Sequence, residues 1–257
     1  MATKTAPALS TEQIQELLSL LQESDSVELK LTVPESHQVA TIHSLELDPL
    51  EAQIRQVFFF DTPDLALDAQ GVVVRARRIQ GKGNDSIVKL RPVVPHELPE
   101  ELRTAAGFRV EVDALPGGFV CSGTMKGTPP DVLGAIHGER PLRKLFSKQQ
   151  RAFYQAHAEG IELDGLLTLG PIFVLKLRLT PKKLGRRLVV EMWLYPDGSR
   201  VLELSTRAAT GEAFQVAAEL RAFLADRGVD VSGDQETKTR KALQYFAKSV
   251  KPATVAA

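Results

Sequence analysis

Short segments in which polar and apolar residues alternate recur along most of the 257-residue chain. Such alternation has the period of a β-strand, whose successive side chains point to opposite faces of a sheet. Turn-forming sequences such as "QGKGND" and "PDGS" separate several segments and favour hairpins between neighbours. The pattern occurs in eight segments: "SVELKLTV", "AQIRQVFFFDT", "GVVVRARRI", "SIVKLRP", "FRVEVDAL", "IFVLKLRLT", "RRLVVEMWLY" and "RVLELSTR". We therefore expect an α+β protein built on an eight-stranded antiparallel β-barrel, closed or nearly closed, with helices packed on its outside.

Helical patterns flank and interrupt these segments. Residues 10–23 carry a capping box formed by Ser10 and Gln13, followed by an apolar stripe at helical spacing. A short helical pattern covers residues 34–45, and a longer one covers 131–158, where Pro141 is expected to start a second helix after a break. Two further helical patterns lie toward the C-terminus. We expect an N-terminal extension with one helix over residues 1–24, one barrel domain over 25–248, and a disordered tail over 249–257. The first helix either caps one mouth of the barrel or forms a contact in a homodimer.

The overall charge is balanced, with 32 basic and 32 acidic residues. A balanced charge gives no global positive field, so neither nucleic acid nor a membrane surface is an expected partner. A single cysteine and the absence of a long apolar run indicate a protein of the reducing cytoplasm.

Charged residues share one face of every predicted strand except 52–62. An outer, solvated face is the usual explanation for one such strand. Here, however, the amphipathic helices must bury their apolar stripes, and the apolar faces of the strands are the available surface. Helices on the outside would turn the charged faces inward. The basic residues of this parity are Lys30, Arg75, Arg77, Lys89, Arg91, Arg109, Lys176 and Arg178, and the acidic ones are Glu28, Glu111, Asp113, Glu191 and Glu203.

A barrel interior with this many charges needs compensation, because buried charge is costly unless it is paired. Arginines grip phosphate oxygens, and carboxylates hold hard divalent cations. The fitting ligand is a phosphate chain chelated to a divalent metal, whereas a lipid would need an apolar interior. Glu191 and Glu203 face each other across the "YPDGS" hairpin, where a metal, lysine or arginine between them would offset their repulsion.

Several motifs in their order resemble the CYTH family, the triphosphate tunnel metalloenzymes. "SVELK" is similar to the second half of the family's Glu-x-Glu-x-Lys first strand. "VFFFDTPDLALDAQGVVVRARR" looks like its aromatic-Asp-Thr-Pro hairpin with an Arg-x-Arg strand, and "SIVKLRP" like the Lys-x-Arg strand that follows. "VLKLRL", "VVEMWLYPDGSRVLEL" and the lysine of "TKTRKAL" match the later strands and the last helix, so the resemblance spans residues 25–246.

The resemblance implies a tunnel that binds a triphosphate-containing molecule or polyphosphate together with Mg²⁺ or Mn²⁺. It implies catalytic roles for Glu28, Lys30 and Arg178. The implied phosphate ligands are Lys30, Arg75, Arg77, Lys89, Arg91, Arg109, Lys176, Arg178 and Lys238. The implied metal ligands are Glu28, Glu111, Glu191 and Glu203, with Asp113 as a further candidate.

Two serines depart from the family pattern. Ser26 stands where the first strand usually has a second glutamate, and Ser205 where the last strand often has one. Losing two carboxylates weakens a metal site. The resemblance as a whole still implies a metal-dependent triphosphatase, acting on inorganic or nucleoside triphosphate. The alternative is a weakened tunnel protein that binds polyphosphate or nucleotide without efficient turnover. Adenylyl cyclase activity ranks third. Trp193, on the charged face, either stacks on a base or plugs the barrel.

Overall fold

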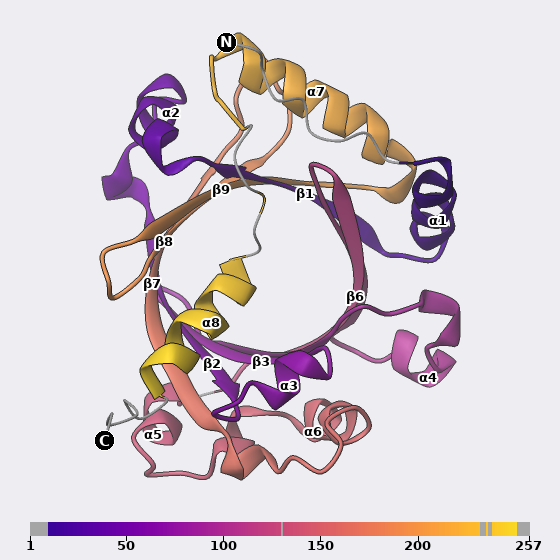
Figure 1. Ribbon diagram of the computed structural model, residues 1–257, viewed down its shortest axis with the longest axis vertical. Helices are drawn as coiled ribbons and strands as arrows, with labels where there is room; N and C mark the ends of the chain where they lie inside the picture. Colours follow the sequence, from indigo (N-terminus) through magenta and orange to yellow (C-terminus); the bar gives the residue numbers. More distant parts are fainter. Residues whose placement is uncertain (1–9, 130, 232–234, 236–237, 251–257) are drawn as a thin grey trace, which may run out of the picture.

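A closed barrel of nine strands forms the body of the protein, as the computed structural model shows (Figure 1). The structure describes residues 10–129, 131–231, 235 and 238–250, with side chains up to residue 248. Around the barrel the strands follow the order β1-β5-β6-β4-β3-β2-β7-β8-β9. Their bounds are β1 Ser26–Val33, β2 Gln53–Asp61, β3 Val72–Ile79, β4 Asp85–Leu90, β5 Phe108–Leu115, β6 Gly118–Gly127, β7 Leu167–Leu179, β8 Leu188–Leu194 and β9 Arg200–Ala208.

The predicted closed barrel is confirmed, but the prediction of eight strands is wrong by one. The missed strand is β6, whose sequence "GFVCSGTMKG" lacks a regular alternation of charged and apolar residues. It pairs with both β5 and β4. Gly123 within it lies under the ring of Phe108, and a Cβ built there would come within 2.8 Å of that ring. The glycine that weakens the strand signal is thus required by close packing.

The barrel is also not wholly antiparallel, because β1 and β5 pair in parallel. Such a pair cannot be joined by a hairpin, and sequence neighbours give no hint of it. In the observed register Ser26 lies beside Glu111 and Glu28 beside Asp113. The parallel pair therefore brings the acidic residues of two distant segments together.

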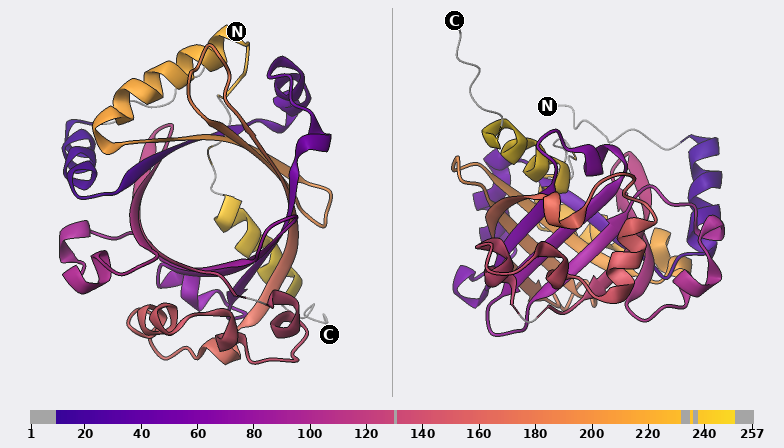
Figure 2. Two further views of the ribbon diagram at one scale, coloured as in Figure 1. Left: turned by 180° about the vertical axis from the view of Figure 1, so that it is seen from behind. Right: turned by 90° about the horizontal axis from the view of Figure 1, so that it is seen from below.

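Helices cover much of the outside of the barrel (Figures 1 and 2). The capping box predicted at Ser10 and Gln13 is confirmed at the start of α1. After Pro141 a single short 3-10 turn forms, and α6 begins only after Ser147, whose side chain caps it. The helix bounds are α1 Thr11–Gln22, α2 Gln38–Ser44, α3 Ala66–Ala69, α4 Glu100–Arg103, α5 Val132–Ile136, α6 Lys148–Gln155, α7 Ala213–Asp226 and α8 Lys238–Val250. The 3-10 helices are η1 Glu35–His37, η2 Pro49–Glu51, η3 Pro95–Glu97, η4 Leu142–Leu145, η5 Leu163–Gly165 and η6 Thr210–Glu212.

The main apolar core lies between the barrel wall and these outer helices. Val27 and Leu29 of β1 are buried in the same cluster as Val216 and Leu220 of α7. Because the apolar strand faces point outward to the helices, the charged faces point into the barrel, as predicted.

The helix α8 departs from the expected arrangement because it lies across one end of the barrel and not on its outer wall (Figure 2). Its residues Ala242 and Leu243 are buried against inward-facing strand residues. The helix includes residues 249 and 250 of the predicted tail, and residues 251–257 lie outside the described residues. Among the described residues, no helix has both the length and the apolar character needed to cross a membrane.

Candidate functional site inside the barrel

One end of the barrel interior is apolar and filled. Inward-facing Val57, Phe59 and Trp193 pack there against Ala242 and Leu243 of α8. The ring of Trp193 is 2% exposed, and its Nε1 donates a hydrogen bond to Glu191 at 3.2 Å. Of the two roles considered for Trp193, the structure therefore shows the plug.

The other end of the interior is open and basic. Arg109, Arg178 and Arg207 occupy inward register positions near the ends of β5, β7 and β9 that lie away from α8, and all three are exposed. Lys126 of β6 is exposed at the same end. Exposed positive charges of this kind would attract an anion to this end of the barrel.

An arginine cluster lines one wall of the interior, on β2 and β3. Arg75 lies at the centre of this wall, and its Nε is buried without a hydrogen-bond partner. Burial, together with the positive charge of Arg77, lowers the pKa of Arg75 to about 9. Burial and Arg77 likewise lower the pKa of Arg55 to about 10, and Arg55 donates two hydrogen bonds to the amide oxygen of Gln53. Among the described residues, Arg55, Arg75 and Arg178 form no ion pair, so their charges are available to an anionic ligand.

Arg77 differs from its neighbours because a carboxylate already holds it. Its Nε donates to Oδ1 of Asp85 at 2.7 Å, and a second nitrogen pairs with the other oxygen. Burial opposes the charge of Arg77, but this bond to Asp85 raises its pKa overall. The negative charge of Glu28 on the opposite wall also contributes to raising the pKa of Arg77.

A carboxylate cluster lies on that opposite wall and consists of Glu28, Glu111 and Asp113. Their oxygens lie within 4.8 Å of one another. Lys30 Nζ lies 3.2 Å from Glu28 and 2.7 Å from Asp113, and Lys89 Nζ lies 3.0 Å from Asp113. Burial disfavours the charge of Asp113, but the two lysines outweigh it and hold the pKa of Asp113 below its usual value. Burial and the neighbouring Glu28 raise the pKa of Glu111.

The two serines at which the sequence departs from the pattern it resembles contact this carboxylate cluster. Ser26 Oγ donates to Glu111 Oε1 at 3.2 Å, and Ser205 Oγ donates to Glu28 Oε1 at 3.3 Å. Each serine thus supplies a hydrogen bond at a place where a glutamate would supply a further ligand and a further negative charge.

The donor set of the cluster fits a hard divalent ion. Three carboxylates at this separation are the ligands that Mg²⁺ and Mn²⁺ prefer. Glu28 and Glu111 were predicted as metal ligands, and Asp113, the further candidate, joins them here.

The other two predicted metal ligands, Glu191 and Glu203, lie apart from this cluster. They face each other across β8 and β9, as predicted. Lys238 of α8 lies between them, paired with Glu191 and 2.6 Å from Glu203, and Lys176 lies 2.7 Å from Glu191. Lysine is thus the cation that offsets their repulsion here. Their role as metal ligands, and the phosphate-binding roles of Lys176 and Lys238, stay predictions.

The remaining predicted phosphate ligands lie at the edges of the interior. Arg91 follows the end of β4 and reaches Asp68 at 3.9 Å. Arg109 is exposed at the basic end of the interior and donates a hydrogen bond to the backbone carbonyl of Phe108. Neither belongs to the arginine cluster.

Sequence reasoning missed four charged residues of the interior: Arg55, Asp85, Lys126 and Arg207. Arg55 shares the parity of Gln53, Val57 and Phe59, so aromatic and aliphatic neighbours conceal it. Arg207 lies two residues after Ser205 and four after Glu203, so the alternation along this strand could have predicted that it faces the interior. Lys126 lies on the strand that was not predicted.

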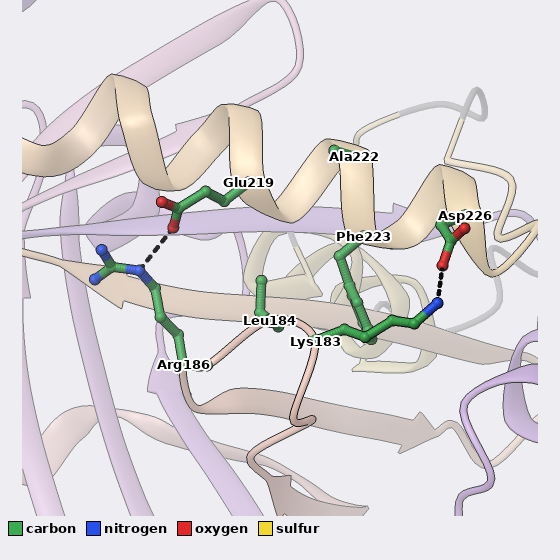
Figure 3. Close-up of a pocket in the computed structure, with 8 residues that line it drawn as sticks. Lys183, Leu184, Arg186, Glu219, Ala222, Phe223 and Asp226 are labelled. Carbon is green, nitrogen blue, oxygen red and sulfur yellow. Dashed lines mark hydrogen bonds and ion pairs between the residues drawn. The ribbon is translucent and has the colours of Figure 1, made fainter.

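A separate groove of about 780 Å³ lies outside the barrel, between α7 and the connection from β7 to β8 (Figure 3). Ion pairs cross it, from Arg186 to Glu219 and from Lys183 to Asp226. Exposed pairs of this kind contribute little energy and leave no unpartnered charge for a ligand.

Comparison with known proteins identifies the fold. No protein-family model and no curated protein matches the sequence. Among solved structures, HpAC1 from Hippeastrum, a candidate adenylyl cyclase described as having a dominant triphosphatase activity, superposes with a TM-score of 0.62 at 16% identity. That match covers 87% of this chain and 98% of HpAC1. A candidate adenylate cyclase from Bacillus halodurans superposes with a TM-score of 0.58 at 12% identity, over 85% of this chain and 97% of the other. This chain therefore shares the fold of these two proteins, and the fold that its resemblance to the CYTH family predicts is confirmed.

Proposed function

We propose that the barrel interior binds a triphosphate together with a divalent metal ion and hydrolyses it, and that the chain is a triphosphate tunnel metalloenzyme. The observation that carries the proposal is the half-buried Arg75, which has a buried Nε without a hydrogen-bond partner and no ion pair among the described residues, opposite a cluster of three carboxylates. A buried charge without a partner is costly to a folded protein, and an anionic ligand would remove that cost. The triphosphatase activity described for HpAC1, which has the same fold, supports the same substrate class.

Each wall has its own role in the proposed reaction. Arg55, Arg75 and Arg178 would hold phosphate oxygens, since they have no ion pair among the described residues. Glu28, Glu111 and Asp113 would hold Mg²⁺ or Mn²⁺, which supplies charge stabilisation at the phosphorus. Lys30, wedged between Glu28 and Asp113, keeps both carboxylates ionised and correctly placed.

A second function has an observation in its favour. Every carboxylate of the cluster already contacts a cation of the chain, and Ser26 and Ser205 reduce the negative charge that attracts a metal. A protein of this kind would bind a triphosphate or polyphosphate and turn it over slowly or not at all.

Phosphate release from inorganic triphosphate, measured with Mg²⁺ and with Mn²⁺, separates the two functions. For a hydrolase, Glu28→Ala should lower the rate by about a hundredfold or more, since it removes charge stabilisation at the reacting centre. Glu97→Ala, at an exposed position outside the barrel, is the matched control and should leave the rate unchanged.

The double variant Ser26→Glu, Ser205→Glu tests the binding function. Tight triphosphate binding without native turnover, followed by turnover in the double variant, would support the binder. If the native protein bound no triphosphate by calorimetry, both functions would be rejected.

A further inference from the structure

Arg207 is a charged residue of the interior that the proposed reaction leaves without a role. It lies at an inward position of β9, directly across from Glu28 of β1. Its guanidinium reaches past β1 and forms an ion pair with Oε1 of Glu111 on β5, the same oxygen to which Ser26 donates. Arg207 thus occupies one side of the carboxylate cluster.

The three cations that contact the carboxylate cluster differ in how firmly they are held. Lys30 and Lys89 are only 15% and 14% exposed, and both contact Asp113, so neither can leave without exposing an unpaired buried charge. Arg207 is 65% exposed and has one ion-pair partner among the described residues. Of these three, Arg207 is the cation that can swing into solvent at low cost.

The two lysines and Arg207 together already match the charge of three carboxylates. A divalent ion that binds Glu28, Glu111 and Asp113 must approach the Glu111 oxygen that Arg207 contacts, and two cations cannot share it without repulsion. Arg207 and the metal therefore compete for the carboxylate of Glu111, and Arg207 does not help to bind the metal.

We propose that Arg207 is a built-in counter-cation of the carboxylate cluster, which competes with the divalent metal for Glu111 and so lowers metal affinity in the protein without phosphate. The inference rests on the proposed function, because it concerns the metal of that same site. It assigns Arg207 to the metal side of the interior, whereas the arginine cluster on β2 and β3 serves the phosphate side.

Binding of Mn²⁺ to the phosphate-free protein tests the proposal directly, by measuring free Mn²⁺ with electron paramagnetic resonance. Arg207→Gln should bind Mn²⁺ about threefold to tenfold more tightly than the native protein, the range expected when a partly exposed ion pair is removed. Arg207→Lys, which keeps the charge, should stay close to the native affinity. Arg186→Gln removes an arginine that forms ion pairs with Glu212 and Glu219 on the outside of the barrel, and it should change nothing.

A second measurement distinguishes a competitor of the metal from a phosphate ligand. Triphosphate affinity in the presence of EDTA should change less than twofold in Arg207→Gln. A large loss of triphosphate affinity, with Mn²⁺ affinity unchanged, would overturn the proposal and make Arg207 a phosphate ligand. Failure of all the proteins to bind Mn²⁺ would also overturn it, while triphosphate binding in EDTA would still report on the proposed function separately.

Discussion

Arg75 shows how a single residue can weaken the free protein and strengthen a complex. Its side chain is half-buried beside Arg77 and Arg55, and its buried Nε has no hydrogen-bond partner among the described residues. Such a group raises the free energy of the folded state, and a bound phosphate would return the lost hydrogen bonds. Stability and affinity should therefore respond to its removal in opposite directions.

Arg75→Met should raise the free energy of unfolding of the ligand-free protein by about 1 kcal/mol, because it removes a half-buried charge whose Nε has no partner in the part of the chain that the structure describes. The same change should weaken triphosphate binding by about tenfold to a hundredfold, the usual worth of charge-assisted hydrogen bonds. Thermal unfolding and calorimetry measure the two effects. Arg78→Met, the neighbour on the outer face that bonds to Gln56, is the matched control and should leave affinity unchanged. A fall in stability with native affinity would contradict the assigned role.

The element that sets the shape of the interior is α8. Its apolar residues fill one end of the barrel beside Trp193. Its first residue, Lys238, forms ion pairs with both Glu191 and Glu203. Lys238 also lies 5.2 Å from the centre of the Trp193 ring. Because this tryptophan is the only one in the chain, its fluorescence reports on the docking of α8.

Leu243→Asp should detach α8 from the end of the barrel, because the substitution would place a carboxylate in an apolar, buried site. The emission of Trp193 should shift to longer wavelength, and trypsin should cleave within α8 at Arg240 or Lys241. The far-ultraviolet signal of the barrel should persist. Gln244→Asp, at the next and exposed position, is the control. An unshifted Trp193 spectrum in Leu243→Asp would show that α8 does not shield this ring.

For the whole molecule, the interior is a network of ion pairs whose strength depends on pH. Lysines hold the pKa values of Asp113 and Glu191 below their usual values, although burial opposes both shifts. A carboxyl whose pKa is depressed by folding contributes stability above its unfolded pKa and loses it as pH falls toward its folded pKa. The raised pKa of Glu111 has the opposite sign, and its cost at neutral pH is relieved on acidification.

The free energy of unfolding should accordingly stay nearly level from neutral pH down to about pH 5. It should fall steeply below about pH 4, where the carboxyl groups of the unfolded chain take up protons. Denaturant unfolding at a series of pH values measures this. Asp113→Asn should cost about 3–5 kcal/mol at neutral pH, because it leaves Lys30 and Lys89 without their shared partner. The difference between native and variant should shrink as pH falls, and parallel curves would argue against a role for Asp113 in acid unfolding.

Much of the prediction came from the alternation of charged and apolar residues along each strand. It placed Lys30, Arg75, Arg77 and Lys89 on one face, and the need of the helices to bury their stripes turned that face inward. It failed where parity is concealed, at Arg55 among aromatic residues, and where the alternation is weak, along β6. Both failures have the same cause. Packing against distant parts of the chain determines which residues occur at these positions, and local strand propensity does not.

Alternation and burial along single strands were enough to predict the closed barrel and its inward charged face. Only the tertiary structure decided which charges meet. The parallel pairing of β1 with β5 created the carboxylate cluster, and α8 gave Glu191 and Glu203 a lysine. The same folding left the Nε of Arg75 buried without a hydrogen-bond partner in the described part of the chain. Pairing of this kind depends on distances between segments far apart in the chain, and electrostatic energy at close range is set by those distances.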